Sequence, residues 1–247
     1  MNHSRLGPRT APVLRLLAAA AAGVLLITSG CAAWRVKQAM ALAQVSEPWQ
    51  QVGHAAPVRL LVVGDSTGVG TGASAATNSL AGLIGQAHPS WTIENRAEDG
   101  AQLADVVRQL HNAPSFDLVL VQAGGNDVIR MRSYSDMQKD IQSVTDLARQ
   151  RSATVIWMPA GNVGNAPFFF APVSWLMTAR SREMHRLVQE TAARSGAVYV
   201  NLFHERSQDP FVTHPELNAR DGLHPSDSGY QIWLRALKAH PRLSALI

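Results

Sequence analysis

One stretch decides the fold of this chain, Arg59-Leu60-Leu61-Val62-Val63-Gly64-Asp65-Ser66-Thr67-Gly68. Its short apolar run, rich in β-branched residues, predicts a buried strand over residues 58–63. The run ends abruptly in Gly64, Asp65 and Ser66, which predicts a turn tight enough to need glycine. The strand therefore delivers one hydroxyl to the rim of a sheet. Ser66 is then either a nucleophile or the N-cap of a helix, and the other motifs have to decide between the two.

Apolar and amphipathic runs alternate along the rest of the chain. They predict strands at 91–95, 117–122, 154–158 and 197–202, and helices at 80–87, 101–111, 135–151 (capped by Ser135), 174–195 (ended by Gly196) and 226–239. This alternation predicts an α/β fold in which a five-stranded parallel sheet is covered by helices on both faces. In such sheets ligands bind beyond the carboxyl ends of the strands, where we expect the functional residues.

Polar motifs follow the predicted strand ends. Asn95-Arg96-Ala97-Glu98-Asp99-Gly100 follows the second strand, Gly124-Gly125-Asn126-Asp127 follows the third, and the loop after the fifth contains Asp221-Gly222-Leu223-His224. Together with Ser66, these motifs contain a hydroxyl, a base, an acid to orient the base, and hydrogen-bond donors for an oxyanion. Those are the parts of a serine hydrolase.

His224 is the candidate base for Ser66, because a protonated hydroxyl is a weak nucleophile. Asp221 lies three residues earlier in the same loop. Its carboxylate can fix the imidazole tautomer that leaves the other ring nitrogen free to take the serine proton. The same two residues are also explained by a plain surface turn that caps the helix at Ser226, so the motif alone does not decide.

The Gly-Gly-Asn-Asp motif has two interpretations as well. The Asn126 amide, with the backbone N–H groups of Gly100 and Ser66, can donate to a developing negative oxygen. The motif is equally typical of a turn without function. We expect Asp65 and Asp127 to brace these loops as acceptors and not to carry protons.

The four motifs together resemble those of the SGNH (GDSL-type) hydrolase family, over roughly residues 58–237. The one departure is Thr67, where leucine is common. The resemblance implies a flavodoxin-like three-layer α/β/α fold and ester hydrolysis without a metal or cofactor. It also implies roles for single residues: Ser66 as nucleophile, His224 as base, Asp221 as its partner, and Ser66, Gly100 and Asn126 as the oxyanion hole.

A metal site is not expected, because the histidines are scattered and no His-x-x-x-His or clustered carboxylate pattern occurs. A metallophosphatase also uses Gly-Asp and Gly-Asn stretches, but it needs histidine ligands beside them. Thr67 and Asp127 stand at those places in this chain.

The segment 159–175 is unusual, because Phe168, Phe169 and Phe170 stand between Pro167 and Pro172. Three consecutive phenylalanines cannot all point inward from one regular element. One hypothesis is that some of them line an acyl pocket or touch a membrane near the site. The alternative is an apolar loop folded onto the core.

Basic charge is concentrated at the N-terminus. Residues 1–37 contain five arginines and lysines and no acid, which leaves 17 bases against 18 acids in the remainder. A nucleic-acid-binding domain would carry its basic excess on the folded part, so we expect no nucleic-acid partner.

The N-terminus resembles a targeting segment. Three arginines precede the uncharged run Leu16–Ile27, and Cys31 follows it. Because Cys31 is the single cysteine of the chain, an internal disulfide is excluded. Three outcomes remain open: lipidation of Cys31, an uncleaved membrane anchor over residues 16–34, or ordinary cleavage. Each exports the domain to the periplasm or cell exterior. We therefore divide the chain into a signal or anchor segment (1–34), a linker (35–57) and a hydrolase domain (58–247).

The sequence thus predicts an exported, membrane-anchored serine esterase that works through an acyl-enzyme. Its substrate would be a lipid ester, a small acyl ester or an O-acetyl group on an envelope glycan. Two alternatives stay open, a specific glycan O-acetylesterase and a non-catalytic binding module on the same fold.

Overall fold

A single parallel sheet organises the protein, whose structure is a computed structural model that describes residues 30, 33–54 and 57–247. The strands are β1 (Arg59–Gly64), β2 (Thr92–Asn95), β3 (Leu118–Gln122), β4 (Thr154–Trp157) and β5 (Val198–Tyr199). They lie in the order β2-β1-β3-β4-β5, with every neighbouring pair parallel. This order is that of flavodoxin-like doubly wound sheets, so the predicted fold class is confirmed.

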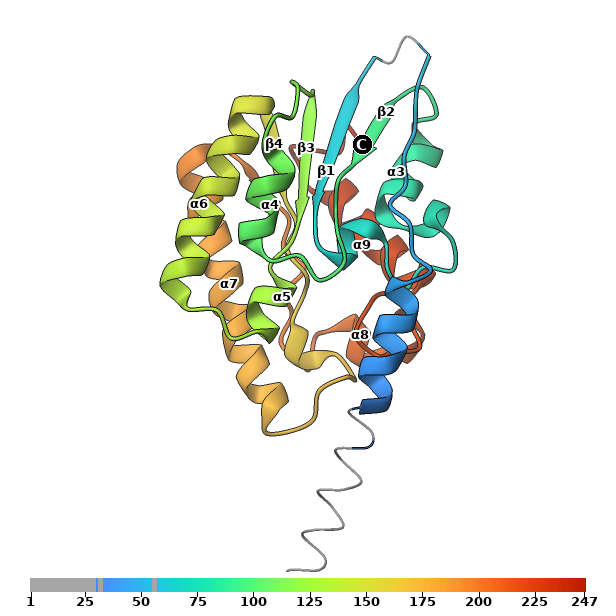
Figure 1. Cartoon of the computed structure of the whole chain (residues 1–247), viewed down its shortest axis with the longest axis vertical. Helices are drawn as coiled ribbons and strands as arrows, with labels where there is room; N and C mark the ends of the chain where they lie inside the picture. Colours follow the sequence, from blue (N-terminus) through green and yellow to red (C-terminus); the bar gives the residue numbers. More distant parts are fainter. Residues whose placement is uncertain (1–29, 31–32, 55–56) are drawn as a thin grey trace, which may run out of the picture.

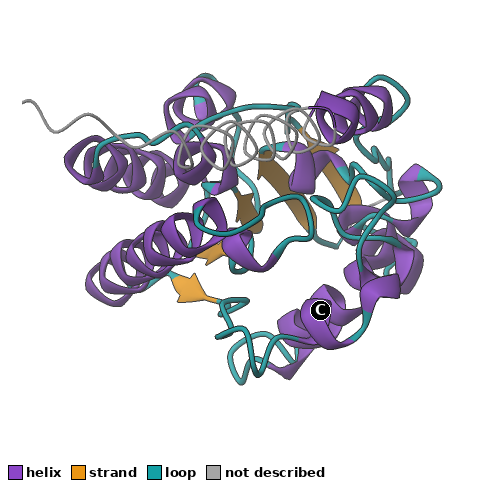
Figure 2. Cartoon of the chain, turned by 90° about the horizontal axis from the view of Figure 1, so that it is seen from below, coloured by secondary structure: helices purple, strands orange, loops and turns teal. Residues whose placement is uncertain are grey.

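Helices cover both faces of the sheet (Figures 1 and 2). The main ones are α3 (Leu80–Ala87), α4 (Leu103–Leu110), α6 (Tyr134–Arg151), α7 (Val173–Ser195) and α9 (Asp227–Ala239). Short helical segments at the carboxyl ends of the strands are α2 (Ser66–Val69), α5 (Gly125–Ile129), α8 (Pro210–Thr213), η1 (Ala76–Asn78), η2 (Val163–Asn165) and η3 (Pro215–Leu217). Helices α4, α6 and α7 pack on one face, and α3 and α9 on the other.

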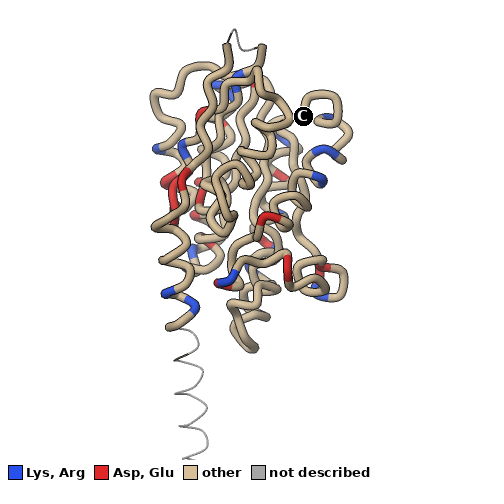
Figure 3. The backbone as a smooth tube through the Cα atoms, turned by 90° about the vertical axis from the view of Figure 1, so that its right-hand side faces the viewer, with Lys and Arg blue, Asp and Glu red and all other residues tan. Residues whose placement is uncertain are grey.

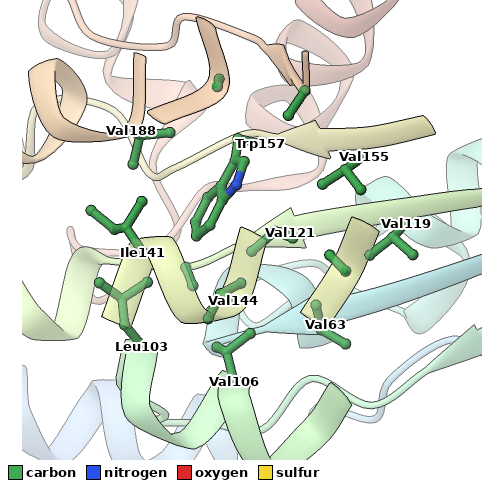
Figure 4. Packing of buried hydrophobic residues seen from close by; sticks show 14 of the residues in the cluster. Val63, Leu103, Val106, Val119, Val121, Ile141, Val144, Val155, Trp157 and Val188 are labelled. Carbon is green, nitrogen blue, oxygen red and sulfur yellow. The ribbon is translucent and has the colours of Figure 1, made fainter. Parts of the chain in front are cut away.

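Alternate side chains of each strand fill two separate cores, because successive residues of a strand point to opposite faces. Val63, Val121 and Trp157 point toward α4, α6 and α7 (Figure 4). Their neighbours Val62 and Leu120 point toward α3 and α9. All five side chains are essentially inaccessible to solvent, and each contributes roughly 1.5–3 kcal/mol of hydrophobic stabilisation. Two well-packed cores hold the strand ends, and so the functional loops, in fixed positions.

The turn after β1 requires glycine for two reasons. Gly64 has a φ of 151°, which L side chains rarely adopt. A Cβ atom there would also lie 1.8 Å from the carbonyl oxygen of Gln122 on the neighbouring strand β3. This close approach lets the Asp65 N–H donate to the same carbonyl at 2.8 Å. The chain is thus held to the sheet up to the residue before Ser66.

One prediction about local structure needs correction. The N-cap of α6 is Ser133, whose hydroxyl accepts from the Asp136 N–H, and not Ser135. Ser133 wins because its backbone is extended, as an N-cap must be. Gly196 does end α7 in a left-handed conformation, as predicted.

The segment predicted as a linker, residues 35–57, has regular structure. Residues 33–43 form a helix, and Leu42 on this helix is buried. Further on, Gln51 forms an antiparallel bridge with Ile93 of β2, through backbone hydrogen bonds of 3.0 and 2.9 Å. Within the described residues these contacts fix the segment against the domain instead of leaving it as a flexible connection.

The predicted targeting segment is mostly outside the described residues. Leu16–Ile27 and Cys31 both fall there, so the structure gives no information on the anchor or on lipidation. Among the residues that the structure describes, no helix is long and apolar enough to cross a membrane.

Replacing Gly64 with alanine should destabilise the fold strongly, because a Cβ atom would overlap the β3 backbone. We expect Gly64→Ala to lower the free energy of unfolding by ~2 kcal/mol or more in chemical denaturation. The control is Gly196→Ala, where φ is 75° but no atom lies within 4 Å of the new Cβ. That variant should lose only ~1 kcal/mol. Equal losses would contradict the argument from close approach.

Candidate active site

A cavity of about 480 Å³ lies at the carboxyl ends of the strands. Four of the residues predicted from the motifs line it: Ser66, Gly100, Asn126 and His224. They come from the ends of β1, β2 and β3 and from the loop before α9, which are far apart in the sequence. The sheet topology brings these strand ends together at one rim.

Ser66 is the first residue of α2, yet it does not cap this helix. The N-cap is Asp65, whose carboxylate accepts from the Thr67 N–H at 2.9 Å and from the Thr67 hydroxyl at 2.8 Å. The Ser66 hydroxyl is therefore free of the capping role and is half-buried at the cavity wall. Its Oγ lies 2.8 Å from Nε2 of His224.

His224 is held on its other side by Asp221, with 2.6 Å between Nδ1 and Oδ2. The second carboxylate oxygen accepts from the backbone N–H groups of Leu223 and His224, at 3.0 and 3.1 Å. When Nδ1 donates to Asp221, Nε2 is left unprotonated and can accept the Ser66 hydroxyl proton. The same carboxylate therefore forms the turn at residues 221–224, through its bonds to the backbone, and holds the imidazole of His224 in place. The surface-turn interpretation and the catalytic interpretation of this motif are thus compatible.

Asp221 keeps its charge in a buried position. Burial by itself would raise the pKa of Asp221, but hydrogen bonding to the His224 side chain, that residue's charge and the two backbone N–H groups outweigh it. The net effect is a pKa below the usual value. The carboxylate thus stays ionised and can stabilise a positive imidazole when the serine proton is transferred.

Donors for an oxyanion converge on the same cavity. The Asn126 amide donates one hydrogen bond to the Ala101 carbonyl at 3.1 Å, which leaves a second amide proton available. Gly100 adopts a left-handed conformation with φ of 75°. In the described part of the chain, the backbone N–H groups of Ser66 and Gly100 donate to no acceptor. These three donors and the Ser66 hydroxyl line one space, as acyl transfer requires.

Asp127 braces the neighbouring loop. Its Oδ2 accepts from the Leu103 N–H at 3.0 Å and so fixes the start of α4. The side chain has no exposed surface, and burial raises the pKa of Asp127 to about 6, against the effect of the Leu103 hydrogen bond. Burial likewise raises the pKa of Asp65, although the bonds from Thr67 oppose it. Both carboxyl groups are occupied as acceptors from the backbone.

Only Phe168 of the three consecutive phenylalanines lines the cavity. Phe169 packs against the core on the α4, α6 and α7 side of the sheet. Phe170 is half exposed, with the guanidinium of Arg35 4.4 Å from its ring centre. Of the three phenylalanines, Phe168 is therefore the candidate for a contact with the acyl group of a substrate.

One wall of the cavity comes from a segment that the motifs did not indicate. Val36, Ala39, Met40 and Ala43 of helix 33–43 line it. Their i, i+3, i+4, i+7 spacing is a sequence signal for an amphipathic helix, but two alanines make it weak. Asp99 was also missed. It lines the cavity and accepts from the Thr71 hydroxyl at 2.6 Å.

The described residues contain no cluster of three or more His, Cys, Asp or Glu side chains suited to a metal ion.

Comparison with known proteins agrees with the four motifs. The model of the GDSL-like lipase/acylhydrolase family matches residues 62–232. No curated protein sequence matches this chain significantly.

Solved structures with a similar fold share little sequence with the chain. A lipolytic protein of the G-D-S-L family from Veillonella parvula is 17% identical with a TM-score of 0.60, covering 75% of this chain and 99% of that one. An extracellular lipase from Streptomyces rimosus is 20% identical with a TM-score of 0.55, covering 74% of this chain and 99% of that one. An acetyl xylan esterase from Geobacillus stearothermophilus is 19% identical with a TM-score of 0.55, covering 76% of this chain and 94% of that one.

The raised pKa of Asp127 predicts a pH dependence of stability. The pKa is about 6 in the folded chain and 3.8 as its ordinary value, so the folded state binds the extra proton between these values. This contribution to stability is present at low pH and is lost as the pH rises from about 4 to 6. Asparagine does not titrate, so Asp127→Asn should remove this pH-dependent loss of stability. In urea denaturation, the free energy of unfolding of the variant should therefore rise relative to that of the wild type by up to ~3 kcal/mol between pH 4 and 7. A difference in unfolding free energy that does not change with pH would contradict it.

Proposed function

This chain belongs to the GDSL-like lipase/acylhydrolase family, and we propose that it is a serine esterase that cleaves carboxylic ester bonds through an acyl-enzyme intermediate. The observation that carries the proposal is the continuous chain of contacts from Ser66 Oγ to His224 Nε2, at 2.8 Å, and from His224 Nδ1 to Asp221 Oδ2, at 2.6 Å. A non-catalytic binding module would not require this aligned relay, so we favour an enzyme.

In the proposed acylation step, Ser66 Oγ attacks the ester carbonyl carbon while His224 Nε2 takes the hydroxyl proton. The carbonyl oxygen becomes an oxyanion that accepts from the N–H groups of Ser66 and Gly100 and from the Asn126 amide. As the carbon–oxygen bond breaks, His224 returns the proton to the departing alcohol. The acyl group is then bound to Ser66.

Deacylation repeats the sequence with water. His224 removes a proton from the water, whose oxygen attacks the acyl carbonyl carbon, and the same donors stabilise the second oxyanion. When the bond to Ser66 breaks, His224 gives the proton back to Oγ, and the carboxylic acid leaves. Asp221 stabilises the positive imidazole in both steps.

The cavity favours an apolar acyl group. Besides the helix 33–43 wall, the apolar side chains of Ile129, Phe168, Leu202, Phe211 and Trp233 line it. We therefore propose a lipid ester or a simple acyl ester as substrate, ahead of an O-acetyl group on an envelope glycan. We also propose that the N-terminal segment exports the domain and holds it at the membrane.

Turnover of a short-chain aryl ester by the purified protein tests the reaction. Ser66→Ala should lower the rate at least ~1000-fold, because removing the nucleophile disables the whole relay. A fluorophosphonate should label the wild type and the control Ser143→Ala, whose hydroxyl is exposed on α6, but not Ser66→Ala. If the wild type shows neither turnover nor labelling, the proposal that this protein is a serine esterase is refuted.

Acyl preference tests the pocket. Phe168→Ser enlarges the cavity wall and makes it polar, so it should shift the chain-length profile of soluble aryl esters by several-fold in kcat/KM. Phe170→Ser is the matched control in the same loop, since Phe170 does not line the cavity. Identical profiles for the wild type and a folded Phe168→Ser variant would remove Phe168 from the acyl site.

A further inference from the structure

Exposed apolar side chains gather at one end of the molecule. Twelve large hydrophobic side chains are exposed in the described part of the chain, and seven of them lie on two short segments. These are Trp34, Val36 and Met40 on helix 33–43, then Phe170 in the loop before α7 and Val173, Trp175 and Leu176 in the first turn of α7. Each of the seven is between 46% and 71% exposed. We call them together the apolar rim.

The two segments that carry the apolar rim contact each other through Arg35, which is not itself a rim residue, and Phe170. The guanidinium of Arg35 on helix 33–43 lies 4.4 Å from the ring centre of Phe170. In Figure 1 the helix that begins the described chain and the first turns of α7 reach the same lower end of the molecule. Residues far apart in the sequence therefore form one surface.

The apolar rim also borders the cavity. Val36 and Met40 belong to both, because they are exposed to solvent and line the cavity wall at the same time. Through Val36 and Met40 the apolar surface on the outside of the molecule therefore adjoins the cavity that Ser66 lines. A surface of this kind is costly in water and indicates a contact with an apolar partner.

We propose that the apolar rim is a membrane-docking surface, through which the catalytic domain itself lies on a lipid bilayer with the cavity mouth toward the acyl chains. The sequence before the rim is the first argument. The uncharged run Leu16–Ile27 ends six residues before Ala33. Even fully extended, such a connection spans at most ~22 Å, so an apolar run held in a membrane keeps the apolar rim close to it.

The composition of the rim is the second argument. Tryptophan is enriched where proteins meet the membrane surface, and the rim presents Trp34 and Trp175. Arg35 and Lys37 stand between the rim residues of helix 33–43, and Figure 3 shows basic positions on its first turns. Aromatic residues flanked by cations suit the boundary between acyl chains and anionic headgroups.

Docking would also name the substrate of the proposed esterase as a membrane lipid, and this part of the inference rests on the proposed function. An ester carried by a membrane lipid can pass its acyl chain along the rim to Ser66 without crossing bulk water. Docking as such does not depend on catalysis, so the two can be tested separately.

Trp175 provides the probe. The full-length chain is reconstituted into vesicles of phosphatidylethanolamine and phosphatidylglycerol with brominated acyl chains, which quench nearby tryptophan fluorescence. Trp34 is the last residue of the predicted anchor and would be quenched by tethering alone. Trp175 is exposed in the first turn of α7, outside the predicted anchor, so its quenching requires this face of the folded domain to contact the bilayer.

We expect bromolipid to quench a component of the fluorescence that is missing in Trp175→Phe. The control Trp91→Phe should leave the quenched amplitude unchanged, because Trp91 is buried before β2, at the opposite end of the strands. Equal quenching in the wild type and Trp175→Phe would overturn the proposal. A second copy or another protein covering the rim would give that same result.

Activity provides the second measurement. Trp175 does not line the cavity, so Trp175→Glu should keep the wild-type rate on a soluble short-chain ester. On an ester embedded in the vesicles the rate should fall at least five-fold. Equal loss on both substrates, or no loss on either, would contradict a docking role. If the wild type cleaves neither ester, the proposed function fails, while the quenching of Trp175 still decides on docking.

Discussion

The end of β1 is the constraint on which the rest of the site depends. Gly64 lets the β1 backbone approach the Gln122 carbonyl of β3, and the next residue, Asp65, bonds to that carbonyl and caps α2. An N-cap side chain stabilises a helix by roughly 0.5–2 kcal/mol, and the turn places Asp65 at the N-cap position of α2. Ser66 then starts the helix with its hydroxyl unused. The conspicuous acid beside the serine thereby acts as scaffold, and the hydroxyl remains available for His224.

Three buried carboxyl groups near the cavity have different roles because their partners differ. Asp221 bonds to an imidazole and to two backbone N–H groups, which stabilise its charge and lower its pKa. In Asp65 and Asp127 burial dominates and raises the pKa, and both serve as acceptors that fix loops. The carboxylate that faces the histidine is therefore the one best kept ionised. Environment, and not residue type, assigns the role.

The cavity is assembled from parts that no local pattern connects. Strand ends supply the polar groups, and helix 33–43 with Phe168 supplies apolar walls. The neighbouring residues Phe168, Phe169 and Phe170 go to the cavity, the core and the surface respectively. Consecutive residues in a loop can diverge in this way because no regular backbone period relates them. The same divergence places an exposed apolar rim directly beside the apolar wall.

The sequence by itself determined the strand and helix pattern, the sheet class and the four motifs that identify the family. These depend on local periodicity, on glycine and on polar residues at strand ends, all of which are readable along the chain. Only the tertiary structure decided that Asp65 and not Ser66 caps α2, and that residues 33–43 form a helix that lines the cavity. It also selected Phe168 from its neighbours. Each of these outcomes depends on contacts between segments distant in sequence, which local patterns do not contain.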